Sequence, residues 1–233
     1  MQINNDYVSF DSFGVSTQFK GNLTTNRFSI LKSTGSVVFN GNAVIQSQLA
    51  TGATNFNMKF NGSNTLIGGQ ANFSNGGLVT LKGNTVFSGP VSFSNAASLE
   101  VQDNLSATSN MTILRPVTVT GPLNLNLGAP TNVISGAITS NENITINATS
   151  SKLSLTGDST NYNGQLIINS GVNLQVGANF LNATGKINGG TLSGNGKIGT
   201  VYGLAGSMAP GSSTGTFTVN GTMTLNYTTV TSV

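Results

Sequence analysis

Residues 152–177 read KLSLTGDSTNYNGQLIINSGVNLQVG, and this stretch repeats a short phrase in which an alternating strand ends in glycine. Copies of the phrase are KLSLTG (152–157), QLIINSG (165–171), NLQVG (173–177), TLSGNG (191–196) and TFTVNG (216–221). Each strand is too short to bury its own apolar face, so stacking each copy on the next is favoured. The repeat therefore predicts a β-solenoid.

Alternation of apolar and polar residues, which marks a strand with one buried face, continues along the whole chain. The clearest segments are 36–40, 55–61, 78–83, 91–95, 98–102, 117–121, 123–128, 144–148 and 222–226. No helical periodicity competes with this pattern. Asn-Gly steps separate many of the strands, at 40–41, 61–62, 75–76, 163–164, 188–189, 195–196 and 220–221. Because these residues tolerate positive φ, we expect them at abrupt corners of an all-β fold.

The spacing of the strands favours a solenoid over a sandwich. A sandwich usually carries turn signals every ~8–12 residues, whereas the intervals here are uneven. The strict six-residue repeat of a left-handed hexapeptide helix is also missing. We therefore predict a right-handed parallel β-helix with roughly 20–25 residues per coil and about ten coils. At ~4.8 Å per coil, residues 1–233 would form a single continuous rod of roughly 50 Å.

The interior of such a rod should consist of ladders of like residues from successive coils. In the N-terminal half we expect these ladders to contain Phe39, Phe56, Phe60, Phe73, Phe87 and Phe93. In the C-terminal half Val, Ile and Leu take over. Asn residues at the corners are expected to form amide ladders along the axis.

Composition excludes several classes of protein. With 37% apolar residues, 30 Gly and only 6% charged residues, the chain is neither disordered nor collagenous. Nine basic and six acidic residues are scattered singly and give a net charge of +3, so we expect no nucleic-acid partner. There is no Cys and no apolar run of the ~18 residues that a membrane-spanning helix needs. Residues 1–10 (MQINNDYVSF) lack the basic and apolar regions of a signal peptide.

The inventory of reactive side chains is short. With no His in the sequence, a Ser-His-Asp triad, a His-ligated zinc site and a His general base are all excluded. Glu100 and Asp103 are close in sequence, but β-helix lyases and hydrolases gather more acids than this on one face. Gly157-Asp158-Ser159 is similar to the motif around some protease nucleophiles, yet Ser159 has no His to activate it. We expect no catalytic, cofactor-binding or metal-binding residue, and no enzyme activity.

Two segments resemble the passenger domains of Gram-negative type V secretion autotransporters. Residues 152–177 are similar to the passenger-associated transport repeat through Leu155, Gly157, Tyr162, Gly164, Ile167, Gly171, Leu174 and Val176. Residues 190–226 are similar to the phrase of that family with an A-P-G-x-S-x-G-T turn, through Ala209, Pro210, Gly211, Ser213, Gly215, Thr216, Val219 and Gly221. The resemblance thus covers the C-terminal coils at 152–226, while residues 1–150 share only composition and strand rhythm.

The resemblance implies a β-helix presented at, or released from, the outer membrane of a Gram-negative bacterium. Such a passenger commonly acts as an adhesin, and we expect a receptor or glycan on host or neighbouring cells as its partner. We expect the chain to be a monomer and to lack the translocator barrel of that family. Two alternatives stay open: a carbohydrate-active β-helix enzyme, and a passenger toxin fragment that oligomerises through its terminal coils.

Overall fold

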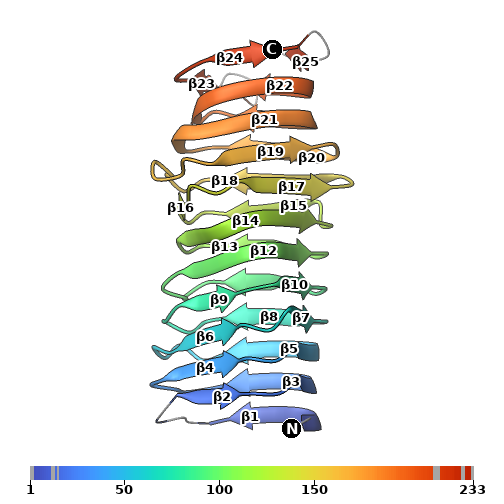
Figure 1. The fold of residues 1–233 in the computed structure, drawn as a ribbon, viewed down its shortest axis with the longest axis vertical. Helices are drawn as coiled ribbons and strands as arrows, with labels where there is room; N and C mark the ends of the chain where they lie inside the picture. The colour runs from blue at the N-terminus through green and yellow to red at the C-terminus, as the bar shows by residue number, and fades with distance from the viewer. Residues whose placement is uncertain (1–2, 12–13, 15, 212–215, 227–228, 232–233) are drawn as a thin grey trace.

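The chain forms a parallel β-solenoid of about 11 turns, as predicted (Figure 1). The computed structural model describes residues 3–11, 14, 16–211, 216–226 and 229–231, and these residues form strands and corners without any helix. The windings stack along the long axis, and the two ends of the chain lie at opposite ends of the stack. Among the residues described, nothing has the helical length and apolarity that crossing a bilayer requires.

The strands, in chain order, are β1 (Ile3–Phe10), β2 (Thr17–Phe19), β3 (Leu23–Ile30), β4 (Ser36–Phe39), β5 (Ala43–Thr51), β6 (Asn57–Phe60), β7 (Asn64–Ile67), β8 (Gln70–Phe73), β9 (Val79–Leu81), β10 (Asn84–Phe87), β11 (Val91–Phe93), β12 (Leu99–Ala107), β13 (Met111–Ile113), β14 (Val117–Leu127), β15 (Thr131–Ile134), β16 (Ile138–Thr139), β17 (Ile144–Ala148), β18 (Ser151–Leu155), β19 (Gln165–Asn169), β20 (Val172–Val176), β21 (Asn179–Gly194), β22 (Lys197–Pro210), β23 (Thr218–Val219), β24 (Met223–Leu225) and β25 (Thr229–Thr231).

Each winding contributes to three parallel sheets, which we call the first, second and third faces. The first face contains β2, β4, β6, β9 and β16, the second contains β7, β10, β17 and β19, and the third contains β8, β11, β13, β15, β18 and β20. The longer strands β1, β3, β5, β12, β14, β21 and β22 bend round a corner and belong to two or more faces. All strand pairings between described residues are parallel, so the hydrogen bonds of the backbone run along the axis.

The windings are more regular than the uneven strand intervals of the sequence indicated. On the second face Asn64, Asn84, Asn104 and Asn124 lie in register, each 20 residues after the last. Differences in length are taken up at corners, as where the β3–β5 register shifts between Thr25 and Arg27. A sheet face therefore keeps its register while the adjoining corner gains or loses a residue.

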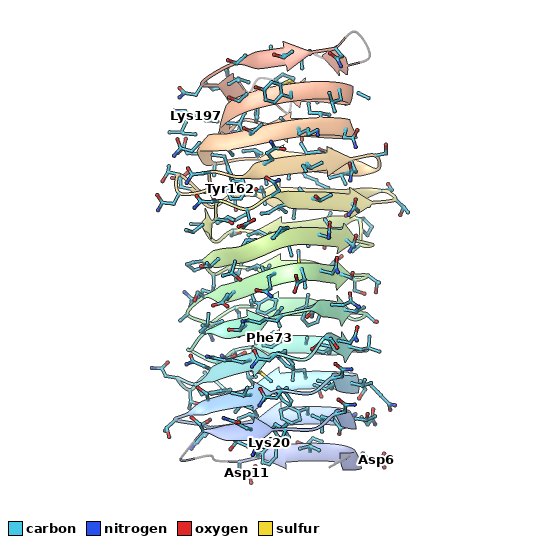
Figure 2. The ribbon with its side chains drawn as sticks, viewed as in Figure 1. Asp6, Asp11, Lys20, Phe73, Tyr162 and Lys197 are labelled. Carbon is cyan, nitrogen blue, oxygen red and sulfur yellow. The ribbon has the colours of Figure 1, made fainter. Side chains whose placement is uncertain are left out.

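A single hydrophobic core runs through the solenoid, and the six Phe residues predicted to lie inside it are all buried. Rings from successive windings stack almost parallel, with centroids 4.7 Å apart for Phe39–Phe60 and 4.5 Å apart for Phe73–Phe93. Figure 2 shows Phe73 and Tyr162 within the outline of the ribbon, whereas Asp6 lies at the edge of the lowest winding. Burial of each ring contributes about 1.5–3 kcal/mol.

Outside the core, Asn side chains form amide ladders as expected, although the longest one in the described residues runs along a sheet face instead of a corner. Along the second face, Nδ2 of Asn147 donates to Oδ1 of Asn126 at 3.1 Å, Asn169 to Asn147 at 2.7 Å, and Asn188 to Asn169 at 2.8 Å. These hydrogen bonds between side chains run along the axis, as those of the backbone do. They satisfy each amide with its equivalent on the neighbouring winding.

The Asn-Gly corners need glycine for a different reason from the one predicted. Among these corners only Gly189 has a left-handed φ, of 91°. At Gly41 the requirement is close stacking, because a Cβ atom there would lie 2.5 Å from the carbonyl carbon of Gly21 on the winding below. Glycine is therefore selected at such corners mainly because two backbones come into contact.

Two buried threonines leave their hydroxyls unpaired. Thr65 and Thr85 lie directly over one another on the second face, with Ala43 and Leu105 as their neighbours in the same inward row. Their Oγ1 atoms have no hydrogen-bond partner. A buried polar group without a partner costs free energy of folding.

We therefore expect Thr65→Val and Thr85→Val each to raise the free energy of unfolding by about 1 kcal/mol, measured by chemical denaturation. Thr51→Val is the matched control. Oγ1 of Thr51 accepts the backbone N–H groups of Ser74 at 2.7 Å and Asn75 at 3.0 Å, so this variant should lose about 1–3 kcal/mol. Destabilisation by Thr65→Val would show that its hydroxyl is paired in solution.

Asn132 is a buried polar residue in an otherwise apolar inward row of the third face. Its Oδ1 accepts the N–H of Met111 at 3.0 Å, and its Nδ2 donates to the carbonyl oxygen of Ala129 at 3.2 Å and to Oγ of Ser151 at 2.9 Å. The residue next to it in the row is Leu153. The amide thus replaces an aliphatic side chain and ties three segments together.

Replacement Asn132→Leu should lower the free energy of unfolding by about 2 kcal/mol or more, because it leaves these buried groups unpaired. The conservative swap Leu174→Met in the same row should cost under about 1.5 kcal/mol. Equal losses for the two variants would contradict a special role for the amide.

Candidate functional site

Glu100 and Asp103 are close in sequence but do not form a site together. Glu100 lies on the first face in register with Thr80 and Thr118. Asp103 lies at a corner with a φ of 67°, and its Oδ2 accepts the N–H of Gly83 at 3.1 Å. Within the described residues no three His, Cys, Asp or Glu side chains gather as metal ligands would.

Ser159 is buried and serves the stacking of windings. Its Oγ accepts the backbone N–H of Ile138 at 2.9 Å and donates to the carbonyl oxygen of Gly157 at 2.9 Å. Both capacities of the hydroxyl are thus used inside the fold. This position gives a substrate no access to the oxygen.

A surface groove of about 530 Å³ crosses β1, β3 and β5 on the third face, and it is the candidate site. We call it the Tyr7 groove. It is lined by Asp6, Tyr7, Asn26, Arg27, Phe28, Ser29, Leu31, Gln48 and Ala50.

The groove arises from two parallel rows of outward side chains. Tyr7, Arg27 and Gln48 lie in register on successive windings and form a tall row. Two residues further along the strands, Ser29 and Ala50 lie in register and form a low row. Since side chains two residues apart project from the same side of a strand, the tall row forms a wall and the low row a floor.

Hydroxyl groups hold the tyrosine against this floor. The Tyr7 hydroxyl lies 3.2 Å from Oγ of Ser29, and Ser29 Oγ donates to Oγ of Ser9 at 3.0 Å. Hydrogen bonds from Ser29 and Ser9 to the phenolate lower the pKa of Tyr7 below its usual value, and the Arg27 charge adds to this effect. Tyr7 as a whole remains 55% exposed.

Tyr7 is unusual in this fold because most aromatic residues face the core. In the described part of the chain, Tyr7 and Tyr202 are the aromatic residues with strongly exposed side chains. Tyr202 projects from the second face in register with Lys186, so the two tyrosines lie on different faces. Leu31, at the rim of the Tyr7 groove, is 53% exposed.

A second hollow, of about 430 Å³, lies beside Lys152 and is lined by residues of β18, β20 and β21 and by Pro130. Glycines at the corners, Gly171, Gly189 and Gly190, leave it open, and the polar groups of Asn173 and Thr191 line it. It contains no aromatic side chain and one charged group. The Tyr7 groove offers the greater variety of contacts.

Sequence reasoning missed the Tyr7 groove. Its three wall residues are separated by 20 and 21 residues, which is the length of one winding, and only the register brings them together. That spacing is the signal that could have revealed it. No protein-family model matches this chain, and comparisons with curated proteins and with solved structures found no match.

The tyrosines should titrate in a definite order. We expect Tyr7 to ionise below its ordinary pKa of 10.0, and Ser29→Ala to move that pKa upward by removing a donor to the phenolate. Burial raises the pKa of Tyr162 well above the same value. Ultraviolet difference titration of the chain and of Tyr7→Phe and Tyr162→Phe assigns each step.

Because the pKa of Tyr162 is raised in the folded state, the stability of the chain should depend on pH in the alkaline range. The neutral phenol is favoured in the folded state, so its contribution is complete below the unfolded pKa near 10 and declines as the pH rises above it. Tyr162→Phe should remove this alkaline decline. A decline that is unchanged in the variant would assign it to another group.

Proposed function

We propose that this chain is part of the passenger of a surface-exposed or secreted autotransporter of a Gram-negative bacterium, and that it acts as an adhesin. Its partner would be a receptor or glycan on host cells or on neighbouring bacteria. The resemblance of residues 152–226 to autotransporter passengers supports the family, and the parallel β-solenoid is the scaffold that this resemblance implies. The exposed Tyr7 groove is the observation that carries the binding role.

A solenoid suits this role because it presents side chains at fixed positions. Backbone pairing between windings sets where each outward row lies, so little conformational freedom is lost when a ligand binds. The side chains of the low row of the third face are uncharged, mostly polar and, apart from Gln175, shorter than those of the tall row. The members of this row after Ser29 and Ala50 are Asn72, Ser92, Thr112, Val133, Ser154, Gln175, Ser193 and Ala209.

A carbohydrate-active enzyme is the second candidate, and one observation favours it. One acidic residue, Asp6, and one basic residue, Arg27, line the same groove. Glycoside hydrolases usually use two carboxyl groups, one on either side of the scissile bond. Among the described lining residues Asp6 supplies the single carboxyl group, so we rank binding above catalysis.

Adhesion is tested with the purified chain, labelled and applied to epithelial cells, to bacterial cells and to a glycan array. We expect saturable binding to at least one of these surfaces. The thermally unfolded chain is the control, because binding that depends on register must be lost with the fold. Binding to no cell and no glycan would refute the adhesin proposal, and release of sugar products from a bound glycan would support the enzyme instead.

A further inference from the structure

We propose that the Tyr7 groove binds a neutral glycan whose chain lies along the axis of the solenoid, an assignment that rests on the binding function proposed above. The rows that form its wall and its floor run along the axis over three windings, so a chain lying between them would follow the axis. Successive windings are ~4.8 Å apart, which is close to the length that one pyranose adds to a linear polysaccharide. The residues of the tall row can therefore contact successive sugars.

Tyr7 supplies the apolar surface that a sugar needs. The residue is 55% exposed, while its hydroxyl lies 3.2 Å from Ser29 Oγ. A ring held at one end and open on its face can pack against the C–H groups of a pyranose. Leu31, also more than half exposed, adds apolar surface at the rim.

The polar groups of the groove match the two hydrogen-bonding capacities of a sugar hydroxyl. Arg27 is only a donor, an ionised Asp6 is only an acceptor, and Gln48 is both. In the described residues neither Arg27 nor Asp6 is occupied by an ion pair. Neighbouring hydroxyls of one sugar both donate and accept, so these three side chains can serve them together.

Charge favours a neutral ligand over an acidic one. The groove carries one carboxylate and one guanidinium, and their formal charges cancel. A polyuronate could pair with Arg27 but would bring its carboxylates towards Asp6. The chain as a whole has only 6% charged residues, so no strong field attracts a polyanion.

Backbone pairing disfavours an extended peptide over the floor of the groove. Peptides are commonly bound by adding a strand to a free sheet edge. Here β3, at the centre of the groove, is already paired with β1 on one side and β5 on the other. The floor offers the side chains of Ser29 and Ala50 instead of free N–H and C=O groups.

The test is titration calorimetry of the full chain with cello-, malto- and galacto-oligosaccharides as neutral probes. Oligogalacturonates serve as the acidic probe, and a peptide of Gly, Ser and Thr as the peptide probe. We expect a neutral oligosaccharide to bind. Tyr7→Ala and Gln48→Ala should each weaken its binding by about tenfold or more, whereas Tyr7→Phe, which keeps the ring, should retain most of the affinity.

Tyr202→Ala is the matched control, since it removes an exposed tyrosine from another face and should leave the affinity unchanged. Thermal denaturation establishes that each variant is folded. Two results would overturn the proposal: preference for oligogalacturonates or the peptide over every neutral probe, or equal affinities of Tyr7→Ala, Gln48→Ala and Tyr202→Ala for a neutral probe. In both cases the chain still binds a ligand, so the adhesin proposal would survive; failure to bind any glycan or cell would remove both.

Discussion

Hydrogen bonding between the backbones of successive windings is the constraint on which the rest of this structure depends. Most of the short strands described have partners one winding below and one winding above, at 16 to 22 residues along the chain in most pairs. A winding cannot bury its apolar side chains alone. Stacking of the windings buries these side chains and at the same time pairs the N–H and C=O groups of the backbone. Glycine at Gly41 and the Asn ladder of the second face both follow from the closeness that such stacking imposes.

The same constraint divides the core into two kinds of packing. Aromatic rings stack at 4.5–4.8 Å, which matches the distance between windings, so Phe19, Phe39 and Phe60 form one column in the N-terminal half, and Phe73 and Phe93 form another. Branched aliphatic side chains have no flat surface that could stack at the distance between windings. A small apolar void of about 20 Å³ lies among Val119, Leu125, Ile146 and their neighbours, where several windings carry only Val, Leu and Ile.

Much of the fold could be predicted from the sequence because its interactions are local in pattern. Alternation identified the strands, and the six Phe residues predicted to lie inside the rod are all buried. The period of the winding was harder to find, because one inward row accepts side chains as different as Ala43, Thr65 and Leu105. Residues that occupy the same inward row therefore need not be of the same type.

The candidate site could not be found in this way. Tyr7, Arg27 and Gln48 each look like an ordinary exposed residue, and their relation appears only when the register of β1, β3 and β5 is known. The roles of Asp103 and Ser159, which we did not expect to be reactive, likewise appear only in their contacts, which support corners. A reactive group is recognised by its surroundings, and in a solenoid those surroundings come from residues a full winding away.

The register shifts at the corners give this fold an uneven tolerance of length changes. Between β3 and β5 an extra residue is absorbed next to Thr25, and between β12 and β14 the offset changes after Val101, while the rows on either side stay aligned. Residues can thus be inserted at a corner of the solenoid, lengthening it into a loop, without disturbing the rows of side chains on the adjoining faces. New surface loops can be added to such a scaffold one corner at a time, because the stacked windings beside each loop already form a stable structure.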